Sequence, residues 1–349
     1  MSKKRIVFCA DGTWAGVSSN TNVYKLYKSL TVSSAQMPFY DDGIGANQLP
    51  LQRLVGGAFG EGIWAKIKEG YTKIAHVYEQ DDDVFIFGFS RGAYTARSLA
   101  GMIAACGLPT KNFSDDLVET AFDAYRDKNN RQAKLEKLAA CNMYCSKIKM
   151  IGVWDTVGAL GIPAIFSGVD PIAYGFLDTE LHPDVLNAYH ALSIDEQRCE
   201  FRPTLWKEST VPGQVMEQVW FCGVHSDVGG GEPDVTEGAP ALADITLSWM
   251  MDKASRLGLQ FDPAAQKQYA DPLDPKYALA KLHSSWSIVW GPPVHRSLPA
   301  NACIADSVLF RYKNDQTWRP ANLQTEAGAL ASAYQLISVL QERSRTATA

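Results

Sequence analysis

The stretch V-F-I-F-G-F-S-R-G-A-Y-T-A-R, from Val84 to Arg97, decides the fold. Its first six residues are apolar apart from Gly88, which is typical of a buried strand. The turn Gly88-Phe89-Ser90-Arg91-Gly92 follows at once, and the apolar residues after it have helical spacing. A serine at such a turn lies in strained backbone with its hydroxyl above the sheet edge, and the flanking glycines remove Cβ atoms that would clash. The order strand, tight turn, helix predicts a nucleophile elbow at Ser90.

The overall composition is that of a globular chain. Its 349 residues are 46% hydrophobic and 20% charged, which excludes the disordered, collagen-like and coiled-coil classes. The net charge is −5, with acids and bases spread along the chain, so we expect no nucleic-acid partner and no strong bulk attraction to anionic lipid. No stretch approaches 18 consecutive apolar residues, so we expect no membrane-spanning segment.

The cysteines and the N-terminus bear on the cellular compartment. Seven cysteines are an odd number, and Cys9 and Cys222 lie in apolar runs where a thiol behaves as a small hydrophobe. Residues 1–13 enter a strand directly, without an apolar run long enough for a signal peptide. We therefore expect a reducing, cytoplasmic location. Cys141 and Cys145 have no second pair at zinc spacing, so we expect no metal.

Three more stretches are largely apolar and resemble buried strands, and each ends at a polar residue. Arg5–Ala10 leads to Asp11-Gly12-Thr13, Ile148–Trp154 leads to Asp155, and Gln218–Val224 leads to His225. The carboxyl ends of parallel strands lie along one edge of an open α/β sheet, where ligands bind. We expect an α/β-hydrolase-like fold with a mainly parallel, doubly wound sheet and helices on both faces.

Helical spacing and capping residues predict the elements between these strands. We expect a short strand at Met37–Tyr40 and helices at the following places: after Asn20-Thr21-Asn22, over Trp64–Tyr78, after Ser114, over Leu242–Met250, and around Ala327–Gln341. The glycine-rich stretch Val55–Gly62 lacks a strand directly before it and an acid at the end of the next strand, so it is no dinucleotide fingerprint. We expect no cofactor.

The length allows one large domain. We expect a single catalytic domain over residues 1–349, with a core at about 1–258. Residues 160–216 are a candidate cap or insertion, and residues 259–349 a C-terminal extension. Leu160–Ala188 has no clear period and is interpreted either as a lid over a pocket or as a long connection.

Ser90, Asp155 and His225 form the constellation that carries chemistry. Their order along the chain, serine then acid then histidine, is that of the α/β-hydrolase fold. His225 would take the proton of the Ser90 hydroxyl as it attacks a carbonyl, and Asp155 would fix the imidazole tautomer. Asp195 and Asp227 are alternatives for the acid, and Asp227 would otherwise orient the loop or bind an ion.

Backbone amides complete the predicted site. The N–H of Arg91, directly after the nucleophile, would hold the oxyanion, together with an amide from the strand-end loop, either Gly12 or Thr13. Such a donor lowers the barrier by roughly 3–4 kcal/mol in known enzymes.

At these residues the chain resembles the type VI secretion phospholipase effector-like α/β-hydrolases. The resemblance spans about residues 5–250 and implies a Ser-Asp-His esterase, in several members a phospholipase A acting on glycerophospholipids. It also implies signal-independent secretion as an effector, as an alternative to a resident cytoplasmic protein. The chain ends soon after the matched region, so we do not expect the C-terminal membrane-binding module of the secreted effectors. The matching stretches are Phe8–Trp14, Asn20–Val23, Gly43–Gly45, Gly88–Ala93, Val153–Gly158, Ala191–Arg198, Gly223–Gly230 and Arg319–Leu323.

The sequence thus favours a serine hydrolase of carboxylic esters, with a lipid or small ester as substrate and peripheral contact with a membrane. Two alternatives stay open at this point. One is a soluble carboxylesterase or thioesterase, and the other is a non-catalytic binding protein on a hydrolase fold. The sequence does not indicate an oligomeric state.

Overall fold

The structure is a computed structural model of the chain. It describes residues 3–12, 19–43, 57–109, 113–127, 129–139, 141, 143–144, 146–157, 180–232, 239–270, 273–323 and 330–340. Side chains at 57–61 and 270 are outside the description.

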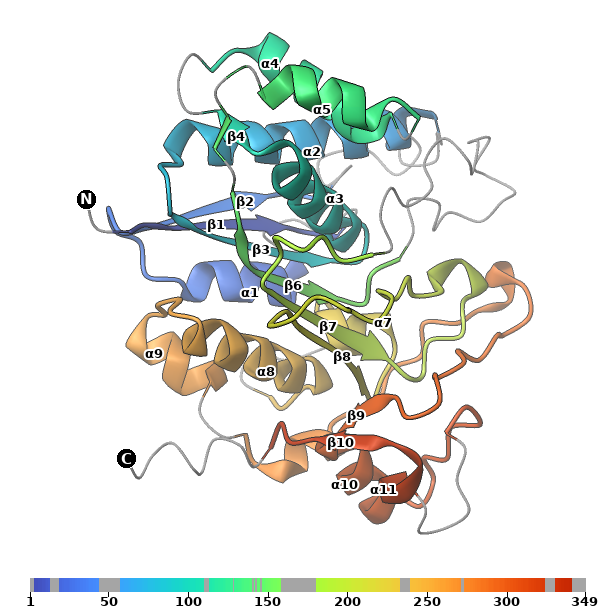
Figure 1. The fold of residues 1–349 in the computed structure, drawn as a ribbon. Coiled ribbons are helices and arrows are strands. Elements are labelled where there is room, and N and C mark those ends of the chain that lie inside the picture. Colours follow the sequence, from blue (N-terminus) through green and yellow to red (C-terminus); the bar gives the residue numbers. More distant parts are fainter. Residues whose placement is uncertain are drawn as a thin grey trace.

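An eight-stranded, wholly parallel sheet forms the centre of the molecule (Figure 1). In sheet order its strands are β10 (Gln335–Ile337), β9 (Cys303–Ala305), β8 (Val215–Phe221), β7 (Asn187–Ser193), β6 (Ile148–Trp154), β3 (Asp83–Phe89), β1 (Arg5–Ala10) and β2 (Gln36–Asp41). A separate antiparallel pair joins β4 (Leu108–Pro109) to β5 (Met143–Tyr144).

Helices cover both faces of the sheet, as predicted (Figure 1). One face carries α2 (Gly57–Val77), α3 (Arg91–Cys106), α4 (Asp115–Arg126) and α5 (Arg131–Ala139). The other carries α1 (Asn22–Ser29), α8 (Leu242–Arg256) and α9 (Pro263–Ala265), while α10 (Asp306–Asn314) and α11 (Leu330–Ala333) lie near β9 and β10. Shorter elements are α7 (His225–Gly229), η3 (Cys199–Phe201), η4 (Gln266–Ala270), η5 (Pro275–Leu279) and η6 (Ile288–Trp290).

The strands divide the core into two clusters because alternate side chains point to opposite faces. In β1, Ile6 and Phe8 pack with α2 and α3, whereas Val7 and Cys9 pack with α1 and α8. Both faces are covered, so the central strands are apolar almost throughout, as parallel sheets require. This explains why β1, β3, β6 and β8 were predictable.

The strand order places a topological switch point between β1 and β3. The chain runs outward from β1 to β2, returns to β3 on the other side of β1, and then continues through β6, β7 and β8. Ligands in such sheets bind outside the carboxyl ends of the strands at this point. Gly12, Ser90, Asp155 and His225 all follow carboxyl ends of strands at this edge of the sheet.

Two regions differ from expectation. Residues 187–193, within the expected cap at 160–216, form the central strand β7 between β6 and β8, and residues 158–179 lie outside the described part. The expected C-terminal extension at 259–349 adds β9 and β10 to the same sheet. The helix predicted around Ala327–Gln341 is limited, within the described residues, to Leu330–Ala333, and strand β10 follows it.

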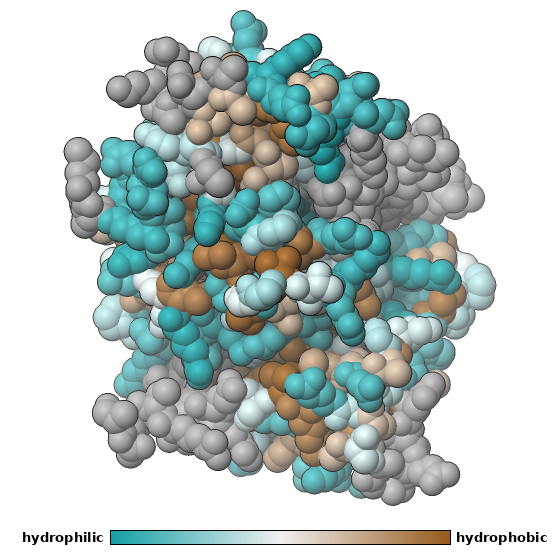
Figure 2. Space-filling model, viewed as in Figure 1, coloured by the Kyte–Doolittle hydropathy of each residue, from teal (hydrophilic) through white to brown (hydrophobic). Residues whose placement is uncertain are grey.

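The surface is mixed. Figure 2 shows hydrophilic residues over most of the visible face, with hydrophobic residues gathered near its centre. Among the described helices, none is both long and apolar enough to cross a membrane.

Candidate active site

Ser90 occupies a strained turn between β3 and α3. Its backbone has a φ of 59° and a ψ of −121°, a conformation that L-residues rarely adopt. The two flanking glycines permit this turn. A Cβ on Gly92 would lie 2.3 Å from the carbonyl oxygens of Ala10 and Asp11, and a Cβ on Gly88 would lie 2.4 Å from the Gly92 carbonyl oxygen. The turn has the geometry of a nucleophile elbow.

Asp155 follows β6 and contacts the His225 ring. Its Oδ2 accepts a 2.6 Å hydrogen bond from His225 Nδ1, and its Oδ1 accepts one of 3.0 Å from the backbone N–H of Ser193. The two alternative acids have other partners. Asp195 accepts from the Gly223 backbone N–H and from Trp318 Nε1.

Asp227 holds the turn that carries His225. Its Oδ2 accepts from the backbone N–H groups of Val224 and His283, and its Oδ1 pairs with His283 Nδ1. Both oxygens therefore stabilise the loop. Among the described residues, no group of three or more histidine, cysteine or acidic side chains could hold a metal ion.

Arg296 forms a bidentate ion pair with Asp155. Its Nη1 donates to Oδ1 at 2.6 Å and its Nη2 to Oδ2 at 2.8 Å, and the same two nitrogens donate to the carbonyls of Ser193 and Phe201. Arg296 is buried and Asp155 is fully inaccessible to solvent. Burial alone would raise the pKa of Asp155, but the charge of Arg296 and the His225 hydrogen bond hold it well below its ordinary value. Asp155 is therefore an anion at neutral pH.

His225 begins α7 and lies between two phenylalanine rings. The ring centroid of Phe89 is 4.6 Å from that of His225, and the centroid of Phe201 is 4.9 Å away in an edge-on arrangement. Burial lowers the pKa of His225 below its ordinary value, although the hydrogen bond and charge of Asp155 act in the opposite direction. A neutral imidazole whose Nδ1–H is held by a carboxylate presents its Nε2 as a proton acceptor.

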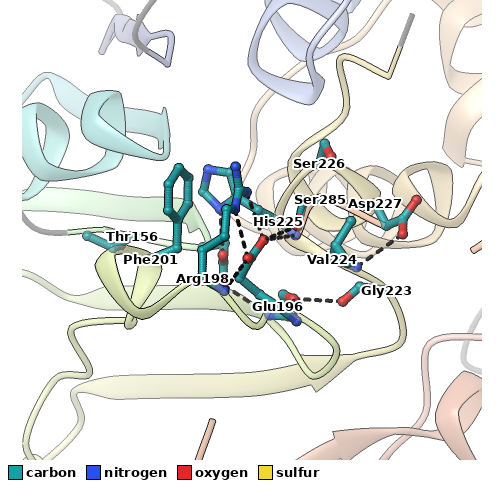
Figure 3. Close-up of polar contacts among 12 residues, drawn as sticks. Thr156, Glu196, Arg198, Phe201, Gly223, Val224, His225, Ser226, Asp227 and Ser285 are labelled. Carbon is teal, nitrogen blue, oxygen red and sulfur yellow. Dashed lines mark hydrogen bonds and ion pairs between the residues drawn. The ribbon is translucent and has the colours of Figure 1, made fainter. Parts of the chain in front are cut away.

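Glu196 and Arg198 lie next to His225 and hold its turn in place (Figure 3). Glu196 Oε2 accepts from the backbone N–H of His225 at 3.2 Å and from the Ser285 hydroxyl at 2.8 Å. Arg198 Nε and Nη2 bind the two oxygens of Glu196, and the guanidinium lies 3.5 Å from the ring centroid of Phe201. Burial raises the pKa of Glu196, but Arg198 outweighs this effect and lowers it to about 2.

Ser90 and His225 open onto one cavity of about 450 Å³. Its charged wall residues are Arg91, Arg198 and Glu232. The described side chains of Ser90 and His225 form no hydrogen bond to each other in this structure, and both line the same cavity.

The oxyanion candidates have different surroundings. Arg91 is the first residue of α3, at the positive end of the helix dipole. Gly12 lies against the elbow, since a Cβ there would be 3.4 Å from the Ser90 Cβ, but its N–H donates to Asp11 Oδ1 at 2.7 Å. The Gly12 N–H is therefore already bound and cannot also donate to an oxyanion without leaving Asp11. Thr13 lies outside the described residues.

Sequence reasoning missed Arg296, Glu196, Arg198 and Phe201 as site residues. Glu196 and Arg198 had one signal, because they fall in a stretch that resembles family positions. Arg296 had none, because it lies in a proline-containing segment 141 residues after Asp155.

The parallel sheet with a switch point and a strained serine turn defines an α/β-hydrolase fold, which confirms the predicted class. Residues 4–253 match the family model described as the type VI secretion system phospholipase effector Tle1-like catalytic domain, and the chain belongs to this family. Membership places the chain among ester hydrolases.

Individual relatives are more distant. An uncharacterized protein of Saccharomyces cerevisiae is 30% identical over 224 residues, which cover 58% of this chain and 32% of the yeast protein. An uncharacterized protein from Pseudomonas aeruginosa of known structure has a TM-score of 0.44 and 16% identity, over 80% of this chain and 51% of that one. A sugar hydrolase from Lactococcus lactis has a TM-score of 0.37 and 11% identity, over 74% of this chain and 92% of that one. A butyrate-bound esterase from Thermogutta terrifontis has a TM-score of 0.35 and 12% identity, over 75% of this chain and 85% of the esterase. The chain thus spans about a third of the yeast protein and half of the Pseudomonas protein.

Proposed function

We propose that this chain is a serine hydrolase that cleaves carboxylic esters of lipids through Ser90, His225 and Asp155. The observation that carries the proposal is the 2.6 Å hydrogen bond between His225 and Asp155 beside a cavity that also contains the strained Ser90. The family match to phospholipase effector catalytic domains supports a lipid ester as substrate.

Each residue has a role that its surroundings support. His225 takes the Ser90 proton as the hydroxyl oxygen attacks the ester carbonyl, and Asp155 stabilises the imidazolium that forms. The Arg91 N–H holds the developing oxyanion, and Thr13 is our candidate for the second donor. The imidazolium returns its proton to the leaving alcohol, and water then releases the acid from the acyl-enzyme.

The cavity wall contains two arginines, Arg91 and Arg198, and the acid Glu232. Arg198 is already ion-paired with Glu196, so the proposal of a phosphate-bearing substrate rests on the family match and not on these charges. The six described cysteines are free thiols, which fits our proposal of a cytoplasmic location.

A fluorophosphonate probe tests the nucleophile. We expect it to label the wild type, and Ser90→Ala to abolish labelling. Ser284→Ala, which removes an exposed serine at the rim of the same cavity, should leave labelling intact. Labelling of Ser90→Ala at the wild-type level would refute the assignment.

Lipid mass spectrometry tests the substrate class. Wild-type protein should release fatty acid from phospholipid vesicles, and Ser90→Ala should not. Cleavage of short-chain nitrophenyl esters without release of fatty acid from vesicles would instead identify a soluble carboxylesterase.

A further inference from the structure

A short apolar segment, Trp286–Trp290, projects from the surface. Ile288 is 85% exposed, Val289 72% and Trp286 36%. These three are among the seven large hydrophobic side chains that are exposed in the described part of the chain, so they form a cluster within five residues. Isolated exposed apolar residues are ordinary, but a contiguous group of them marks an interaction site.

The segment has a defined shape. Ile288–Trp290 form the 3₁₀ turn η6, which ends at Gly291 with a φ of 73°. The indole Nε1 of Trp286 donates to the Gly291 carbonyl at 3.0 Å, which closes the loop on itself. Trp290 packs edge-on against Phe201, with ring centroids 5.7 Å apart. The base of the loop is therefore fixed while Ile288 and Val289 stay in solvent.

The segment adjoins residues that line the catalytic cavity. Ser284 and Ser285, just before it, line that cavity. Phe201 contacts Trp290 on one side and the His225 ring on the other. In Figure 1 the orange connection that includes η6 runs out to the right edge of the molecule, beside the olive turn of η3.

The stretch of sequence around the segment is basic. No aspartate or glutamate occurs between residues 275 and 305, whereas Lys276 and Lys281 do; Arg296 in the same stretch is buried against Asp155 and adds no surface charge. Lys276 and Lys281 are exposed, and so is Arg202, which follows η3, whereas the acid within η3, Glu200, is half-buried. The chain as a whole has a net charge of −5, so this region is locally basic on an acidic protein. Basic residues next to exposed apolar ones complement an anionic lipid surface.

We propose that Trp286–Trp290 is the segment by which this protein docks on a bilayer, with Ile288 and Val289 inserted among the acyl chains. Tryptophans beside the two aliphatic residues suit the bilayer interface, where an amphipathic ring has one apolar and one wet side. Five residues are too few for a stable protein interface, which buries more than about 1,000 Å². The inference rests on the proposed lipid substrate, because docking here places the cavity mouth at the lipid surface.

Sedimentation with vesicles of phosphatidylcholine and phosphatidylserine tests the docking. The wild type should sediment with the vesicles, and the double variant Ile288→Ser/Val289→Ser should bind at least about tenfold more weakly, since both aliphatic side chains lose their transfer into hydrocarbon. Val32→Ser is the matched control, because Val32 is a 74% exposed aliphatic residue outside this segment. It should bind like the wild type.

Hydrolysis of a soluble nitrophenyl ester keeps the two proposals apart. The double variant should retain wild-type activity on this ester, which also shows that it is folded, and Ser90→Ala should lose activity but still bind vesicles. Equal vesicle binding by the double variant and the wild type would overturn the docking proposal. The proposal would also be overturned if the wild type cleaves the soluble ester but does not bind vesicles. It would be overturned as well if the wild type is a dimer and the double variant is a monomer. Failure of Ser90-dependent labelling with intact vesicle binding would overturn the catalytic proposal alone.

Discussion

Replacing Arg296 with glutamine removes the positive charge that lies against the Asp155 carboxylate. Glutamine can donate from one amide nitrogen, whereas Arg296 makes four hydrogen bonds, two of them to Asp155. The carboxylate has no access to solvent that could replace its partner. Arg296→Gln therefore leaves a buried anion that only His225 and the Ser193 N–H stabilise.

The expected loss is large for one substitution. Removing one partner of a buried ion pair costs about 3–5 kcal/mol. With an unfolding entropy of about 2.1 cal/mol/K per residue over 349 residues, the melting temperature should fall by about 4–7 °C. Loss of a nearby cation should also raise the pKa of His225, so the acidic limb of the kcat/KM profile should move to higher pH.

Differential scanning calorimetry and the pH dependence of hydrolysis of a soluble ester measure the two effects. Arg202→Gln is the matched control, because Arg202 is an exposed arginine on the same side of the site. Its melting temperature should stay within about 1 °C of the wild type, since surface substitutions change stability little. Arg296→Lys keeps the charge without the bidentate geometry and should fall between the wild type and Arg296→Gln.

Two results would refute this reasoning. If Arg296→Gln has the same melting temperature as Arg202→Gln, the buried ion pair does not stabilise the fold. If Arg296→Gln is destabilised but the acidic limb of its kcat/KM profile stays at the wild-type pH, Arg296 stabilises the fold and does not influence the pKa of His225.

Two further predictions concern the elbow and the histidine. Burial lowers the pKa of His225, and the neutral ring is the active form. The value of kcat/KM should therefore stay level down to mildly acidic pH and fall with a midpoint below about 6.5, the ordinary histidine pKa. A midpoint above that value would contradict the assignment of His225 as the base. Gly92→Ala should prevent correct folding of the elbow, because its Cβ would lie 2.3 Å from two backbone carbonyl oxygens, whereas Gly12→Ala meets the Phe89 ring at 3.3 Å and should be milder. Yields of soluble protein and probe labelling compare the two variants, and equal behaviour would show that the contacts at Gly92 can relax.

The parts of the fold that sequence predicted are those with continuous apolar runs. Strands β1, β3 and β6 and the last three residues of β8 are buried on both faces, so their composition is sufficient to identify them. Strand β7 contains the polar residues His190 and Ser193, and it was not predicted. Both are buried with partners, since His190 Nε2 accepts from the Thr156 N–H and the Ser193 hydroxyl donates to the Gly223 carbonyl. Such partners are not visible in a local pattern.

The same distinction applies to the site. Ser90, Asp155 and His225 each follow a recognisable strand, and strand ends of a parallel sheet meet at one edge, so their proximity was predictable. Arg296 follows no strand and has no motif, and only the folded chain brings it to Asp155. Gly12 was predicted as an oxyanion donor from its place after β1, but the local Asp11 carboxylate already occupies its N–H.

The distance in sequence between Asp155 and Arg296 also sets the order in which the site matures during synthesis. The ribosome synthesises Ser90, Asp155 and His225 before Arg296. At a translation rate of about 5–20 residues per second, the interval from His225 to Arg296 is about 4–14 s. Until then the acid of the growing chain lacks the cation that compensates its burial. Turn η6, the proposed docking segment, is synthesised shortly before Arg296. The proposed triad therefore lacks its supporting cation, and the proposed docking loop is absent, until the chain has been synthesised beyond about residue 296.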